Sequence, residues 1–287
     1  HLPIERYGDM SSLKDLKARV SPSILRRLKS DKEIIADLPE KIELSEWVSL
    51  SKEQKSLYQA IVDKTMNEIA ISPNGGNHGK ILGLLTKLKQ ICNHPSLFLK
   101  EKNIGENFVG RSLKLKRLEE ILEEVIEAGD RALMFTQFRE WGDLLKKYLE
   151  EKWLFEVPFL HGGSSKVERQ AMIDRFQEDP RGPQLFLLSL KAGGVGLNLT
   201  RANHVFHIDR WWNPAVENQA TDRAYRIGQE KRVIVHKFIT SNSIEEKIDQ
   251  MMRKKAKLAE DIIGSGENWL GDLDADQLSK LVSLEES

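Results

Sequence analysis

Residues 185–229 read LFLLSLKAGGVGLNLTRANHVFHIDRWWNPAVENQATDRAYRIGQ, and this stretch decides the fold. Its pattern predicts an apolar strand, a glycine-rich turn, a second strand and then a helix that carries Arg223 and Arg226. Two arginines three residues apart would lie on one helical face, with Cβ atoms about 5–6 Å apart. Guanidinium groups keep their charge and match phosphate oxygens in geometry, so the pair would suit a polyphosphate. The stretch therefore predicts a site that faces a nucleotide.

Strands and helices alternate on both sides of this stretch. Short apolar strands are expected at residues 132–136, 157–160, 185–190, 204–208 and 233–238. Helices are expected near residues 141–152, 165–177 and 214–226, the last of them capped by Asn213 and Pro214. Such alternation is typical of a three-layer α/β fold. We therefore predict a mostly parallel sheet with helices on both faces.

Three regions of the chain differ in pattern. Residues 1–111 read mainly helical and include a short, compact insertion, whereas residues 112–242 hold the alternating strands and helices. Residues 243–287 begin with one long helix and end in an acidic tail. The sequence thus predicts an α/β core between a helical first part and a C-terminal helix.

The composition is that of an ordinary soluble protein, with 40% hydrophobic and 31% charged residues. The 44 basic and 44 acidic residues cancel, so any contact with DNA must come from a local patch. No apolar run reaches about 18 residues, which argues against a membrane partner. Cys92 is the only cysteine, which excludes an internal disulfide and fits a reducing, intracellular compartment. The chain starts at His1 without an initiator Met or a signal pattern, as a fragment of a longer protein would.

The turn after the strand at 185–190 is the first candidate binding element. Gly194 and Gly196 let the backbone approach a ligand or adopt positive φ, and ligands of parallel sheets bind beyond the carboxyl ends of strands. With Ser189 and Lys191 before the turn, both phosphate recognition and contact with the DNA backbone are consistent with the pattern. A tight turn that simply requires glycine is the alternative.

Two further features also have a plain structural explanation. Arg223 and Arg226 could be solvated, with Asp222 as their ion-pair partner. Trp211 and Trp212 are adjacent, so both cannot enter one core from a regular element. One of them is expected to pack, and the other could stack on a base or remain a partly covered surface side chain. No second ligand stands at usable spacing from His94 or His161, so no metal site is expected.

Taken together, several strings resemble the second, C-terminal RecA-like lobe of the Swi/Snf family of DNA-dependent ATPases in superfamily two. The resemblance runs along almost the whole chain, and the short insertion is similar to that of prokaryotic members. The strings are SILRRLKSDKEIIADLPEKIE, LKQICNHPSL, KLKRLEEILEE, RALMFTQF, LHGGSSKVERQAMIDRF and the stretch quoted first.

The resemblance implies roles for individual residues. Arg223 and Arg226 match paired arginine fingers that reach the γ-phosphate of ATP on a partner lobe, and Gln219 opens the same motif. The residues that match nucleotide-facing positions are Gly194, Gly196 and Asp222. The residues that match DNA contacts are Ser189, Lys191, His161, Gly162 and Trp212. The helix at 244–259 resembles the brace that packs on the first lobe.

The chain lacks the other half of such an enzyme. No Gly-x-x-x-x-Gly-Lys-Ser/Thr motif and no Asp-Glu dipeptide occurs. The resemblance therefore implies a motor lobe that is inactive alone, with ATP and Mg²⁺ held mainly by the N-terminal RecA-like lobe of the same polypeptide. Double-stranded DNA would be the other partner, and the protein would be a monomer in the cytoplasm or nucleoid of a prokaryote, or in a eukaryotic nucleus. Remodelling of protein–DNA complexes and DNA repair are both compatible tasks.

Two other functions are compatible with parts of the pattern. A non-catalytic RecA-like module that binds DNA or a protein would explain the neutral charge and the missing phosphate loop. A dinucleotide-dependent oxidoreductase is excluded, because the Gly-x-Gly-x-x-Gly spacing fails at Leu199.

Overall fold

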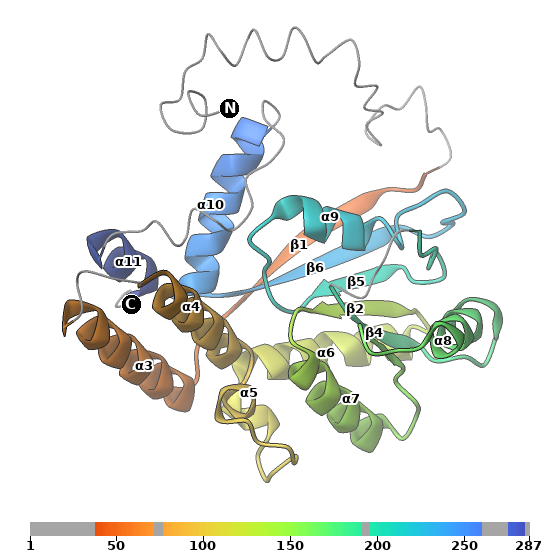
Figure 1. Cartoon of the computed structure of the whole chain (residues 1–287). Helices are drawn as coiled ribbons and strands as arrows, with labels where there is room; N and C mark the ends of the chain where they lie inside the picture. Colours follow the sequence, from red (N-terminus) through yellow and green to blue (C-terminus); the bar gives the residue numbers. More distant parts are fainter. Residues whose placement is uncertain (1–37, 72–76, 191–195, 260–274, 285–287) are drawn as a thin grey trace, which may run out of the picture. The chain divides into compact units, whose positions relative to one another are not determined.

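A six-stranded parallel sheet forms the centre of the computed structural model, which describes residues 38–71, 77–190, 196–259 and 275–284 (Figure 1). The chain divides into two units, His1–Leu38 and Pro39–Ser287, and the description below concerns the second. The helices expected before residue 38 lie outside the described residues. The strands are β1 (Lys41–Val48), β2 (Ala132–Thr136), β3 (Phe159–Leu160), β4 (Leu185–Ser189), β5 (His204–His207) and β6 (Val233–Thr240).

The helices that the structure describes fall in two groups. Those that alternate with strands are α6 (Leu113–Glu127), α7 (Arg139–Trp153), α8 (Lys166–Glu178) and α9 (Pro214–Thr221). The others are α3 (Lys52–Ile71), α4 (Asn77–Asn93), α5 (Pro95–Leu99), η2 (Val109–Arg111), α10 (Ile244–Ala259) and α11 (Ala275–Val282).

The order of strands in the sheet is β1-β6-β5-β2-β4-β3, and each neighbouring pair is parallel. Alternate residues of one strand enter different cores. Ala132 and Met134 of β2 pack with α6 and α7, whereas Leu133 and Phe135 pack with α8 and α9. Successive side chains of a strand point to opposite faces, so the two pairs of helices cover opposite faces of the sheet, and Figure 1 shows α9 on the other side of the strands from α6 and α7. The predicted three-layer parallel fold is confirmed.

A third core lies among the helices outside the alternating region. Tyr58 of α3, Leu88 of α4 and Leu278 of α11 are buried together with Ile244 and Ile248 of α10. These residues recur at helical spacing, which is why each helix buries one side. The C-terminal helix thus packs against helices of its own unit.

Strand β1 was not expected, because residues 1–111 were read as mainly helical. Its sequence, KIELSEWV, carries charged side chains at positions that an interior strand would fill with apolar ones. It lies at the edge of the sheet, where Glu43 pairs with Lys237 at 2.5 Å and Glu46 accepts from His236 at 3.0 Å. Polar cross-strand pairs therefore replace apolar burial, and the usual strand signal is weak.

Candidate functional site

The carboxyl ends of β2, β4 and β5 bring several sequence-predicted residues to one edge of the sheet. Ser189 ends β4 beside Thr136, which ends β2, and the Leu190 amide donates to the Thr136 carbonyl at 3.0 Å. Ser189 is 7% exposed. Lys191 and Gly194 lie outside the described residues, so their predicted roles keep the status of predictions.

The described part of the loop that follows β4 begins at Gly196, whose φ is 99°. Residues other than glycine rarely adopt this angle, so the backbone itself requires glycine there. Leu199 is buried beneath α8 and α9, and its amide donates to the Arg223 carbonyl at 2.9 Å. The loop after β4 is therefore tied directly to the segment that carries the two arginines.

Arg223 and Arg226 do not lie on one helical face, contrary to the prediction. Helix α9 ends at Thr221, and residues 222–229 form a series of turns, called the arginine turn below. The Arg226 amide donates to the Ala224 carbonyl at 3.1 Å, whereas a continued helix would use the Asp222 carbonyl. Leu199 uses the Arg223 carbonyl, and the Gln229 side chain donates to the carbonyls of Ala224 and Ala202 at 3.0 and 2.8 Å.

The two arginines differ in exposure instead. Arg223 is 6% exposed, and its pKa is lowered first by burial and then by the positive charge of Arg169 in α8. Arg226 is exposed, and its backbone is held on both sides by bonds to Ala224 and Gln229. The arrangement presents one outward guanidinium beside a buried one.

The remaining residues of this motif lie close by in the chain. Gln219 is exposed on α9, and Asp222 caps the end of that helix with its amide bonded to the Asn218 carbonyl at 2.8 Å. Gln229 received no role from sequence, although its side chain clasps the arginine turn. The only signal was its place at the end of the quoted stretch.

His161 and Gly162 lie in a loop that starts where β3 ends. The His161 ring packs edge-on against Phe159 at 5.1 Å, and its Nδ1 accepts from the Gly163 amide at 3.0 Å. Gly162 is exposed, with no atom within 4 Å of an added Cβ. Ser165 and Glu168 then form a capping box that starts α8.

Trp211 and Trp212 both pack, each against a different core. Trp211 contacts the core under α8 and α9, and Trp212 contacts the helical core of α3, α4, α10 and α11. The Lys89 ammonium lies 5.6 and 5.3 Å from the two ring centroids. Both rings are half-buried, so the expectation that only one would pack is wrong, and each ring keeps an exposed part.

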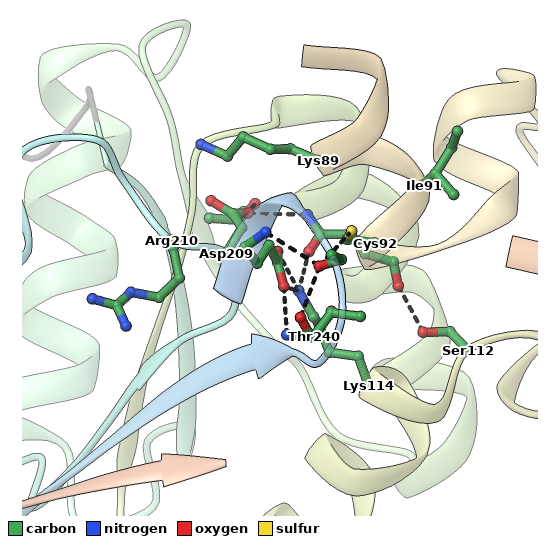
Figure 2. A network of polar contacts seen from close by, with 12 residues as sticks. Lys89, Ile91, Cys92, Ser112, Lys114, Asp209, Arg210 and Thr240 are labelled. Carbon is green, nitrogen blue, oxygen red and sulfur yellow. Dashed lines mark hydrogen bonds and ion pairs between the residues drawn. The ribbon is translucent and has the colours of Figure 1, made fainter. Parts of the chain in front are cut away.

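A buried polar network occupies the same edge of the sheet, and Figure 2 shows side chains such as Lys114 and Asp209 converging on it. Asp209, which follows β5, accepts from Thr136 Oγ1 at 2.6 Å, Asn93 Nδ2 at 3.1 Å and Gln137 Nε2 at 2.9 Å. Burial raises the pKa of Asp209, against the effect of the Lys89 charge. Lys114 donates to Asn93 and, at 2.6 Å, to Glu245 of α10. Sequence reasoning missed this network.

The cofactors that the resemblance implies are ATP and Mg²⁺. Guanidinium groups at Arg223 and Arg226 fit phosphate oxygens. Among the residues that the structure describes, no group of three or more His, Cys, Asp or Glu is arranged to hold a metal ion. The described part of the chain therefore shows no all-protein cage for Mg²⁺, which in phosphate-binding sites is usually held by one or two carboxylates and the phosphates. It also contains no helix long and apolar enough to cross a bilayer.

Known families match two parts of the chain. The helicase conserved C-terminal domain matches residues 113–228, and the SNF2-related domain matches residues 1–97. Together with the parallel sheet, these matches define a RecA-like helicase lobe.

Individual relatives identify the family. The chain is 42% identical to the Sulfolobus solfataricus SWI2/SNF2 ATPase C-terminal domain, with 86% of this chain and 100% of that chain covered and a TM-score of 0.72. It is 45% identical to the core of that ATPase in complex with double-stranded DNA, with 99% and 58% covered and a TM-score of 0.75. The chain belongs to the SWI2/SNF2 family of ATPases.

A longer relative shows how much of such a protein the chain represents. YwqA of Bacillus subtilis, whose name describes an ATP-dependent helicase/translocase, is 47% identical over 99% of this chain. The chain spans 30% of the length of that protein. The resemblance to prokaryotic members is therefore confirmed.

Proposed function

We propose that the chain is the second motor lobe of an ATP-dependent double-stranded DNA translocase. The observation that best supports this proposal is the arginine turn, which holds out Arg226 on a backbone fixed by tertiary bonds. A guanidinium that must reach an anion on another surface needs such a rigid base, because misplacement by about 1 Å can cost about a hundredfold in rate.

In the proposed cycle, this chain supplies positively charged guanidinium groups to ATP bound on the first lobe. When the two lobes close on ATP, Arg226 and Arg223 would neutralise charge that develops on the γ-phosphate. Gln219 would couple the lobes, and Asp222 would face the nucleotide. We assign Mg²⁺ mainly to the first lobe, as the resemblance to the family implies.

The DNA grip is proposed at the carboxyl edge of the sheet. Ser189 and Trp212 lie there, Lys191 follows Ser189 in the chain, and the loop of His161 and Gly162 follows β3. The relative that was solved with double-stranded DNA supports this partner. When the lobes reopen after hydrolysis, this lobe and its DNA contacts would move along the DNA. We propose an intracellular, monomeric enzyme.

The test is Arg226→Ala in a polypeptide that holds both lobes. We expect kcat for DNA-stimulated ATP hydrolysis to fall by about 10³–10⁵, as for other arginine fingers, with DNA affinity nearly intact. Arg232→Ala is the matched control, because Arg232 is also exposed, lies six positions later and pairs with Glu40 at 2.9 Å. Equal loss of turnover and DNA binding in Arg226→Ala would contradict the finger role.

The second candidate is a non-catalytic DNA- or protein-binding module, which the net charge of zero favours. ATP hydrolysis with DNA separates the two functions when measured for this chain alone and joined to a first lobe. No hydrolysis by the chain alone, together with hydrolysis by the joined protein, would support the motor. No hydrolysis by either protein would support the binding module.

A further inference from the structure

Arg210 connects three elements through buried ionic contacts. Its Nε and Nη2 donate to the two carboxylate oxygens of Glu217 in α9, at 3.0 and 3.2 Å, and its Nη1 donates to Asp249 in α10. All three side chains are at most 5% exposed. Figure 2 shows Arg210 directed away from its neighbour Asp209, so the two residues serve separate networks.

The charges in this group, called the Arg210 cluster, support one another. Burial alone would lower the pKa of Arg210, but Glu217 and Asp249 raise it. Burial would raise the pKa of Glu217, but Arg210 lowers it. Charges so far from water are stable only while paired, which makes their relative geometry stringent. The cluster therefore fixes α9 and α10 relative to each other.

Helix α9 depends on such contacts for its orientation. It has eight residues, which is too short to be stable as an isolated helix. Glu217 holds its first half and also accepts from the Trp211 amide at 2.9 Å. At its end, Thr221 Oγ1 lies 2.9 Å from His207 Nε2. The arginine turn begins at the next residue, so the position of Glu217 bears directly on Arg223 and Arg226.

Helix α10 carries a second buried ion pair that does not involve α9. Glu245 pairs with Lys114 of α6 at 2.6 Å, and both side chains are at most 2% exposed. Glu245 and Asp249 are four residues apart and therefore lie on one face of α10. The Glu245–Lys114 and Asp249–Arg210 pairs are both buried, and both attach α10 to the rest of the lobe. Only the Asp249–Arg210 pair is connected, through Glu217 of α9, to the arginine turn.

We propose that Asp249, acting through Arg210 and Glu217, is a positioning residue for the arginine turn. The C-terminal helix α10 then sets how Arg223 and Arg226 are presented, and a displacement of α10 changes hydrolysis. Arg253 extends the connection to the surface, because it donates to Asp249 at 2.7 Å while being 61% exposed. The inference rests on the proposed function of the two arginines.

The test compares two isosteric variants in the polypeptide with both lobes. Asp249→Asn removes the charge that α10 applies to Arg210, and Glu245→Gln removes the equivalent charge from Lys114. We expect Asp249→Asn to lower kcat about ten- to a hundredfold with KM for ATP and Kd for DNA changed less than about threefold. Glu245→Gln should leave kcat within about twofold, although thermal unfolding shows a comparable loss of stability.

Equal effects of the two variants on kcat, or an unchanged kcat in Asp249→Asn, would overturn the proposal. Arg210→Lys serves if Asp249→Asn does not fold, since it keeps a cation between the two carboxylates but loses the two-pronged contact with Glu217. It should show the same selective loss of kcat, and an unchanged kcat would again overturn the proposal. Arg226→Ala is measured in parallel. If Arg226→Ala keeps full ATP turnover, the proposed function fails. If Arg226→Ala loses turnover while Asp249→Asn keeps it, only the present inference is rejected.

Discussion

At the residue scale, burial decides the chemistry of the histidines. His94 caps α5 by accepting from the Ser96 amide at 3.1 Å, and its Nε2 donates to the Phe108 carbonyl at 2.8 Å. Burial lowers the pKa of His94 to about 4, and it lowers the pKa of His207 to about 4 as well. Both rings are therefore neutral at neutral pH, and the histidine of the Asn-His-Pro string serves as a helix cap.

This burial makes stability depend on pH. A histidine whose pKa is lower in the folded state binds its proton more readily after unfolding. Stability is therefore fully present above about pH 6.5 and falls as the pH drops toward 4. Between pH 6.5 and 5, we expect His94 and His207 each to remove about 2 kcal/mol from the free energy of unfolding. His204 and His236, whose pKa values burial also lowers, act in the same direction.

Urea unfolding at pH 6.5 and 5 tests this expectation. His94→Asn keeps an acceptor at the helix cap but cannot titrate, so its stability should fall less over the same interval. A pH dependence identical to that of the unchanged chain would contradict the assignment to His94.

At the element scale, two glutamine side chains hold turns that follow helices by donating to backbone carbonyls. After α9, the Leu199 amide donates to the Arg223 carbonyl and the Gln229 side chain donates to the Ala224 carbonyl, and these bonds hold the arginine turn. Gln184 makes a similar pair of bonds elsewhere, to the carbonyls of Ile126 and Asp130 at 3.2 and 3.3 Å. The two glutamines are thus alike in chemistry but differ in what they hold.

Substitution of these glutamines separates stability from function. Gln229→Ala and Gln184→Ala should each lower the free energy of unfolding by about 1–3 kcal/mol, because backbone carbonyls lose a donor. Only Gln229→Ala should also lower ATP turnover in the two-lobe polypeptide, since only that side chain holds the arginine turn. Denaturant unfolding and steady-state hydrolysis measure the two effects, and an equal loss of turnover in both variants would speak against the role of the turn.

At the scale of the whole described unit, one buried ion pair and the hydrogen bonds around it join the helical core to the sheet. Lys114 of α6 contacts Asn93 at the end of α4 and Glu245 at the start of α10, while Asp209 contacts Asn93 from the end of β5. The Thr240 amide, at the end of β6, also donates to Glu245 at 2.9 Å. These contacts predict that the helices and the sheet unfold together.

A double-mutant cycle tests this coupling. Lys114→Met leaves Glu245 charged and buried, so we expect a loss of about 3–5 kcal/mol in the free energy of unfolding. The double variant Lys114→Met with Glu245→Gln removes both charges and keeps an acceptor for Thr240, so it should recover much of that loss. A double variant whose loss equals the sum of the single losses would show that the two residues are not coupled.

The sequence by itself determined the parallel sheet and the family. Apolar strands such as those at β2 and β4 are buried on both faces, so their strings are continuous and easily recognised.

The exposed position of Arg226 and the buried position of Arg223 were decided only by the tertiary structure. The same holds for β1, whose charged side chains are explained by partners on β6, and for the Arg210 cluster, whose members are up to 39 positions apart. The physical reason is common to all three. The local sequence pattern predicts which side chains are buried. The end of a helix and the pairing of a buried charge depend instead on hydrogen-bond donors and acceptors from distant parts of the chain.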